Sequence, residues 1–206
     1  MGKGLGRALG AAALIAAFVG TITAGPAAAQ AYSDSYSFLK AVRERDGNKV
    51  TSLVSEPGTV VANSKDRSTG EGALHIVTRD RDYQWLSFLM SKGVRLDLQD
   101  RKGATALSLA AQLGWLEGAD LMLKYGASPD LPNSRGETPL ILAVQQRNLP
   151  MARMLLAKGA NPKRPDSAAG LSAIDYATRD GARSAAILKL LQAPPVPAKK
   201  AAGPKL

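Results

Sequence analysis

Glycine recurs along this chain at one fixed spacing, in two interleaved series. The first series, separated by 33, 33 and 34 residues, is Gly70, Gly103, Gly136 and Gly170. The second series, separated by 33 and 33 residues, is Gly93, Gly126 and Gly159. A fixed period of this length is typical of repeat proteins, in which each copy buries its apolar surface against its neighbours. The spacing therefore predicts an elongated array with one long surface, an architecture suited to binding.

Each glycine of the first series opens a similar stretch of eight residues. The third position of these stretches holds Gly72, Thr105, Thr138 or Ser172. These residue types serve as N-caps of helices, and Pro139 stands where a first-turn proline is tolerated. Apolar residues then recur at helical spacing. A helix is predicted to begin in every copy.

A second helix is expected to follow the first in each copy. These second helices are expected over residues 83–92, 116–125, 149–158 and 184–192. The second glycine series follows the first three of them, where glycine is favoured as a left-handed C-cap. Between the copies, residues 94–102, 127–135 and 160–169 are predicted to form finger-like hairpin loops. Residues 36–54 have the helix-pair pattern without the glycine start and are interpreted as an N-terminal capping unit.

The eight-residue stretches resemble the ankyrin signature G-x-T-P-L-H-x-A, and residues 136–143 match it best. The resemblance extends over about residues 36–192. It implies an all-α ankyrin-repeat solenoid of about five helix pairs, with three fuller central repeats between atypical capping units. The chain is similar to small ankyrin-repeat proteins that Gram-negative bacteria export with a signal peptide.

The N-terminus has the layout of a secretory signal peptide. Lys3 and Arg7 precede an apolar run over residues 9–19, and small residues follow. Cleavage is expected after Ala29 or Ala31, which makes residues 1–31 the signal peptide. The alternative is an uncleaved membrane anchor, but the apolar run is shorter than the roughly 20 residues that span a bilayer. The expected location is the periplasm, or alternatively the outside of the cell.

The rest of the chain divides into a short extension over residues 32–35, an ankyrin domain over 36–193 and a disordered Pro/Ala/Lys tail over 194–206. The formal net charge of the whole chain is +10. This balance favours either an ordinary solvated surface or attraction to an acidic partner or an anionic envelope surface. Export argues against a nucleic-acid partner, and we expect a monomer.

The chain has few of the residue types that catalyse reactions or bind metals. The chain has no cysteine and a single histidine, His75, so the common zinc sites are excluded. The resemblance implies that His75 ties its own turn to the next repeat by hydrogen bonds, although the usual threonine three residues earlier is Gly72. The acidic residues are scattered over separate copies, and no nucleophile elbow or phosphate loop occurs. We therefore expect neither enzymatic activity nor a cofactor or metal.

By resemblance, partners contact the loop tips and the exposed side of the first helices. The candidate partner-binding residues are Arg79, Arg101, Lys102, Gln112, Trp115, Arg135, Gln145, Gln146 and Arg179. The five basic side chains in this set would form a stripe that suits a partner rich in carboxylates, or they are simply solvated. The Trp115 side chain either covers the core, as a lid, or is exposed and contacts a partner.

The sequence thus favours a non-enzymatic protein–protein interaction module, exported to the bacterial envelope, that binds a protein through its concave face and loop tips. The alternative is an envelope-associated scaffold held to anionic lipid or polysaccharide by its basic surface and tail. A small-molecule hydrolase or lyase would need acidic and basic groups in one pocket, and the sequence shows no such set.

Overall fold

The computed structural model describes residues 26–55 and 60–193, and within these ranges every regular element is a helix. Five helix pairs follow one another along the chain. They are α1 (Pro26–Glu44) with α2 (Gly47–Val54), α3 (Ala73–Arg79) with α4 (Tyr83–Ser91), α5 (Ala106–Leu113) with α6 (Leu116–Lys124), α7 (Pro139–Gln145) with α8 (Leu149–Ala157), and α9 (Ala173–Asp180) with α10 (Ala185–Gln192). Two short 3₁₀ turns, η1 (Val61–Asn63) and η2 (Gly181–Ser184), complete the set. The predicted all-α array of five pairs, here called units 1 to 5, is confirmed.

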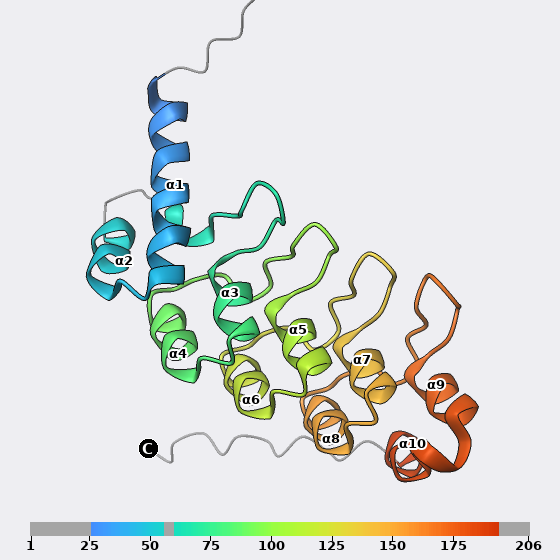
Figure 1. The fold of residues 1–206 in the computed structure, drawn as a ribbon. Helices are drawn as coiled ribbons and strands as arrows, with labels where there is room; N and C mark the ends of the chain where they lie inside the picture. The colour runs from blue at the N-terminus through green and yellow to red at the C-terminus, as the bar shows by residue number, and fades with distance from the viewer. Residues whose placement is uncertain (1–25, 56–59, 194–206) are drawn as a thin grey trace, which may run out of the picture.

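The helices form two rows (Figure 1). Helices α3, α5, α7 and α9 lie side by side in an inner row, and α4, α6, α8 and α10 form an outer row. The loops that join successive units project from the same side of the array. We call them finger 1 (residues 64–71), finger 2 (94–104), finger 3 (127–137) and finger 4 (160–171).

Three inner helices, α5, α7 and α9, are each preceded by a residue whose side-chain oxygen accepts a hydrogen bond from a free backbone N–H group of the first turn. Thr105 Oγ1 accepts from the backbone N–H of Ser108 at 3.1 Å, and Thr138 Oγ1 accepts from that of Ile141 at 3.3 Å. Ser172 caps α9 in the same way. The predicted helix starts are confirmed, because side-chain oxygens at this position replace water as acceptors.

Alanine occupies the tightest contacts between the units. Ala110, Ala143 and Ala177 occupy equivalent positions of three inner helices, and none of them is exposed to solvent. Leu89, Met122 and Leu155 fill the outer row and are likewise fully buried. Alanine at these inner positions leaves room for neighbouring inner helices to approach closely, while larger buried side chains keep the core filled.

Hydrogen bonds join the fingertips in sequence. The backbone N–H of Arg101 donates to the carbonyl of Thr69 at 3.0 Å, and that of Ser134 donates to the carbonyl of Lys102 at 2.8 Å. Ser167 N–H donates to the carbonyl of Arg135 at 2.8 Å. Each finger is thus tied to the next by its main chain, which fixes the fingers as one ordered row.

A second set of links joins the units at the turn between their helices. The residues Arg45, Arg81 and Arg147 have φ angles of 61°, 53° and 52°, a left-handed conformation that non-glycine residues seldom adopt. Each side chain reaches the following unit: Arg45 pairs with Asp80 and Asp82, and Arg81 donates to the carbonyl of Leu113. Arg147 makes two hydrogen bonds to the Asp180 carboxylate, at 2.7 and 2.8 Å. These arginines thus link neighbouring units by ion pairs and hydrogen bonds.

Helix α1 begins earlier than the predicted start of the ankyrin domain at residue 36. Its helical backbone includes residues 26–35, which sequence reasoning assigned to the end of the signal peptide and the extension. The first buried apolar side chain described in α1 is Phe38. Residues 1–25 and the tail lie outside the described residues, so the leader and the tail stay predictions. None of the described helices is long and apolar enough to cross a membrane.

The finger row predicts unequal effects of alanine at two equivalent glycines. A Cβ at Gly136 would lie 2.2 Å from the backbone nitrogen of Ser167, whereas a Cβ at Gly170 would meet nothing within 4 Å. Both residues have positive φ, so Gly170→Ala is expected to cost about 1–2 kcal/mol from backbone strain alone. Gly136→Ala is expected to cost about 1–3 kcal/mol more, because finger 4 must move. Urea unfolding followed by circular dichroism measures both.

Gly170→Ala is the matched control, since it changes the same residue type in the same backbone conformation. Equal losses of stability in the two variants would mean that the contact between fingers 3 and 4 contributes nothing.

Candidate binding surface

One position of the inner helix faces solvent in every unit from 2 to 5. It is occupied by Arg79, Gln112, Gln145 and Arg179, and all four are exposed. Together with the flanks of the fingers beside them, these side chains form what we call the inner face. Four of the predicted partner-binding residues therefore lie in one row.

The inner face is hollowed where units 2 and 3 meet. This hollow, of about 520 Å³, is lined on the finger side by Ser68, Thr69, Glu71, Asp100, Arg101, Lys102 and Ala104 and on the helix side by His75, Arg79, Leu109 and Gln112. It is bounded by both fingers and helices, so it is a groove between them. The structure thus brings four of the predicted residues around one depression.

A buried carboxylate lies beneath Arg79. The side chain of Glu71 is 9% exposed and pairs with the guanidinium of Arg79, which is 57% exposed. Both terminal nitrogens of Arg79 donate to the two carboxylate oxygens of Glu71. Such a two-point contact fixes the plane of the guanidinium. Arg79 is consequently held in place at the surface.

The same arrangement recurs two units further on. The Glu137 side chain is 6% exposed and accepts hydrogen bonds from Asn133, Arg135 and Gln145. Burial raises the pKa of Glu137, but these hydrogen bonds outweigh burial, so its pKa lies below the usual value. The carboxylate is therefore ionised and neutralises Arg135. A charge reversal at Arg135 would disturb this buried group, which makes Arg135 a poor probe of binding.

In unit 5, the exposed arginine of the row rests on an aromatic ring. The Arg179 guanidinium carbon lies 5.0 Å from the ring centroid of Tyr176, a cation–π contact. The Tyr176 hydroxyl donates to the carboxylate of buried Asp166 at 2.6 Å, and this hydrogen bond is the main reason that the pKa of Tyr176 is raised. Arg179 is thus also positioned by its neighbours.

The remaining candidates on the inner face are less constrained. Arg101 donates to the carbonyl of Arg67 on the neighbouring finger. Gln112 and Gln146 are exposed, and in the described part of the chain their side chains make no hydrogen bond. These amides are available to a partner.

Trp115 does not belong to the inner face. It precedes α6 at the turn between the helices of unit 3 and is 6% exposed. Its ring packs so closely on Gly118 that a Cβ there would lie 2.2 Å from a ring carbon. Of the two interpretations, the structure favours the lid over the core, and the inclusion of Trp115 among the partner-binding residues is corrected accordingly.

His75 links two units. Its Nδ1 accepts from the backbone N–H of Gly72 at 3.2 Å, and its Nε2 lies 2.8 Å from the carbonyl oxygen of Ala104 in the next unit. These contacts require a neutral ring with the proton on Nε2. The structural interpretation of His75 is confirmed. Its Nδ1 accepts from the N-cap backbone of α3 as Ser108 Oγ does at the start of α5, whereas Gly72 provides no side-chain acceptor for the N–H of His75.

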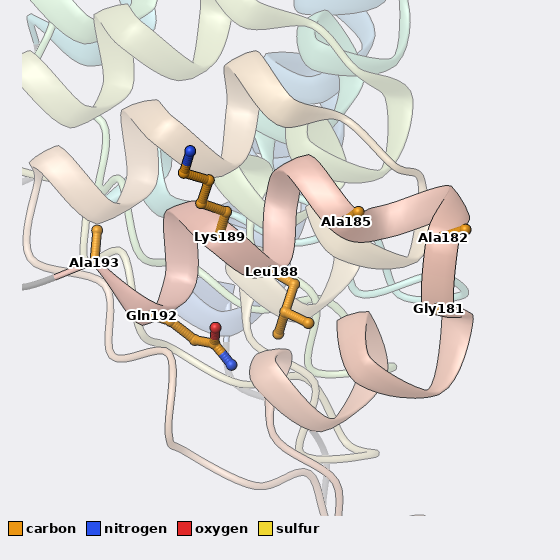
Figure 2. Close-up of a pocket in the computed structure, with 7 residues that line it drawn as sticks. All are labelled: Gly181, Ala182, Ala185, Leu188, Lys189, Gln192 and Ala193. Carbon is orange, nitrogen blue, oxygen red and sulfur yellow. The ribbon is translucent and has the colours of Figure 1, made fainter.

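A further hollow, of about 580 Å³, lies at the C-terminal end of the array (Figure 2). Gly181, Ala182, Ala185, Leu188, Lys189, Gln192 and Ala193 line it. Lys189 points to one side of α10, whereas Leu188 and Gln192 point to the other. Its few polar groups do not converge, so it is no candidate site. Within the described residues, no group of three metal-ligating side chains occurs either.

Comparison with known families decides what the array is. A family model described as ankyrin repeats in three copies matches residues 38–133, 74–166 and 116–196. The chain belongs to the ankyrin-repeat family. Ankyrin repeats are general protein–protein interaction modules and are typically non-enzymatic. The family thus suggests a protein as the partner of this array.

Sequence reasoning missed the buried carboxylates of the inner face. Glu71 and Glu137 each follow a glycine of the first series, at the same position of two eight-residue stretches. That repetition could have indicated the ion pairs, because a glutamate that recurs next to a helix start is expected to have a basic partner within the fold. The partners Arg79 and Arg135 differ in position, so spacing alone did not identify the pairs.

The contacts of His75 predict that stability falls in mild acid. Burial lowers the pKa of folded His75, and the contact with Ala104 opposes this only in part. The unfolded ring, with a pKa near 6.5, binds a proton that the folded ring excludes. The free energy of unfolding should therefore decrease from pH 7.5 to 5.5, by at most about 1.4 kcal/mol per pH unit.

His75→Gln is the control, since His75 is the single histidine of the chain and few other groups titrate in this window. The variant should be less stable at pH 7.5 but should lose the slope. A slope that persists in His75→Gln would show that another group is responsible. Chemical denaturation at each pH provides the measurement.

Proposed function

We propose that this ankyrin-repeat protein binds a protein partner on its inner face. The observation that supports the proposal is the row of exposed, positioned side chains between the fingers and the inner helices. Arg79 and Arg179 are each fixed by a neighbouring group, at the two ends of the row. A side chain that is already ordered loses less conformational entropy when a partner binds.

The pairing of charges alters what this partner is expected to be. Glu71 and Glu137 neutralise two of the five basic side chains that sequence reasoning placed in one stripe. A uniformly acidic partner is therefore not required, and a surface of mixed polarity suits the row better. In the middle of the row, Gln112 presents an amide that both donates and accepts hydrogen bonds, whereas the amide of Gln145 already donates to Glu137.

We also propose that the protein acts outside the cytoplasm, in the bacterial envelope. The support comes from the basic, apolar and small-residue sections of residues 1–31. Cleavage before Tyr32 would leave Phe38 and every later buried residue of α1 in the mature chain. Cleavage would shorten the start of α1 but is compatible with the buried core of the first unit.

Site-specific photocrosslinking tests the binding proposal. A benzoylphenylalanine residue is placed at Gln112 or at Gln145, both exposed in the row of the inner face. Irradiation of cells of the source organism is expected to give a protein adduct, identified by mass spectrometry, because a bound partner lies against these positions. The same residue at Gln84 or Gln192, exposed on the outer helices α4 and α10, serves as the matched control.

Adducts that form equally from the inner and outer positions would indicate non-specific contact. Adducts from the outer helices alone would place the partner on the other face and refute the proposal.

Export is tested by the mass and location of the protein in the same cells. We expect a chain that begins at Tyr32 or Gln30 and is released by osmotic shock. Ala29→Arg disrupts both small-x-small sites and should leave the full-length precursor, whereas Gln30→Arg changes a tolerant position and should still be processed. A full-length protein in the cytoplasm of unmodified cells would exclude export.

A further inference from the structure

The basic side chains of the inner face differ in which neighbouring groups contact their charged ends. Arg79 and Arg135 pair with buried glutamates, and Arg179 lies over a tyrosine ring. Lys102 is exposed at the tip of finger 2, and in residues 26–55 and 60–193 its ammonium group makes no ion pair or hydrogen bond. A lysine without a partner keeps its full charge available to a ligand.

The hollow beside Lys102 has an excess of positive charge. Three cations, those of Arg79, Arg101 and Lys102, line it together with two carboxylates, Glu71 and Asp100. The second hollow of the inner face, of about 310 Å³, lies between units 4 and 5 and is lined by Val144, Gln145, Tyr176, Arg179 and Asp180. There one cation faces one carboxylate, and that carboxylate is already bound by Arg147. The hollow between units 2 and 3 therefore has a positive excess that the hollow between units 4 and 5 lacks.

The other groups of this hollow suit a carboxylate on an aliphatic stem. Leu109 contributes a half-buried apolar side chain, and Gln112 contributes a free carboxamide. Arg79 uses one N–H of each terminal nitrogen for Glu71, which leaves further N–H donors of its guanidinium. An acidic side chain entering the hollow would find apolar contact for its stem and three donors for its oxygens.

We propose that the hollow between fingers 1 and 2 is a pocket for an aspartate or glutamate side chain of a protein partner, with Lys102 as the main charged contact. The proposal deepens the proposed function and rests on it for the identity of the face that binds. Charge complementarity selects the acidic occupant. Lys102 is thus a specificity-determining residue.

Nuclear magnetic resonance on the ¹⁵N-labelled full chain tests this pocket with a defined probe. N-acetylated hexaglutamate is titrated in about 50 mM salt, where the Debye length is above 10 Å and charge contacts are weakly screened. Hexaglutamine, of the same length without charge, is the control peptide. We expect saturable shifts of the Gln112 side-chain amide and of the Gly103 backbone amide with hexaglutamate alone.

Two charge reversals separate the local contact from the overall charge. Lys102→Glu is expected to weaken hexaglutamate binding at least tenfold. Lys163→Glu makes the same change in net charge at an exposed lysine of finger 4, outside the hollow, and is expected to weaken binding less than twofold. The side chain of Lys102 is not part of the finger row, because only its backbone bonds to Asp100 and Ser134. A dispersed spectrum confirms that each variant is folded.

The proposed pocket would be refuted if the two charge reversals weakened hexaglutamate binding equally, or if saturable shifts occurred without a shift of the Gln112 side-chain amide. Those results would leave binding on the inner face intact, since the crosslinks from Gln145 do not depend on the probe. Crosslinks confined to the outer helices, combined with the expected shifts, would instead refute a protein partner on the inner face and leave a carboxylate site there.

Discussion

The contact between neighbouring units is the interaction on which the whole structure depends. No single helix pair can bury both of its apolar sides, so each unit gains a core only when another unit covers it. Ala110 and Ala143 are completely enclosed at these contacts. The polar links run across the same junctions, from the His75 ring to the carbonyl of Ala104 and along the backbone of the fingers. Apolar burial and hydrogen bonding thus act at the same places, and both are local.

This local construction also explains the inner face. Because every unit presents the same helix position to solvent, a change of one residue per unit changes the surface without disturbing the junctions. Units 2 and 4 place a glutamate under the surface and an arginine above it, whereas unit 3 has Ala104 at the corresponding place. The surface is therefore a series of separately adjustable positions on an invariant frame. Under the proposed function, the order of these side chains would determine which partner fits.

The period of the glycines was sufficient to predict the helix pairs of units 2 to 5, their starts and the fingers, and the apolar spacing within residues 36–54 predicted the first pair. These features depend on backbone conformation and on apolar spacing. The charge pairs were not predictable in the same way. Glu71 and Arg79 come into contact only because the end of finger 1 packs against helix α3. Arg81 and Arg147 have a left-handed φ at the position where unit 3 has Gly114, and the residue type alone did not indicate that conformation. Trp115 was undecided from sequence, since its burial depends on the absence of a side chain at Gly118. The residues of the inner face followed from the family pattern, whereas the side chains that remain free to bind emerged only from three-dimensional contacts.

The last finger has a consequence for engineering. Gly170 keeps the positive φ of its equivalents, at 67°, although within the described residues no further finger follows it and the space beside it is open. Unit 5 therefore retains the geometry of an interior unit at this point. A designer who wishes to lengthen the array has a ready junction there: one grafted module would extend the row of exposed positions by a single step, without any redesign of the modules before it.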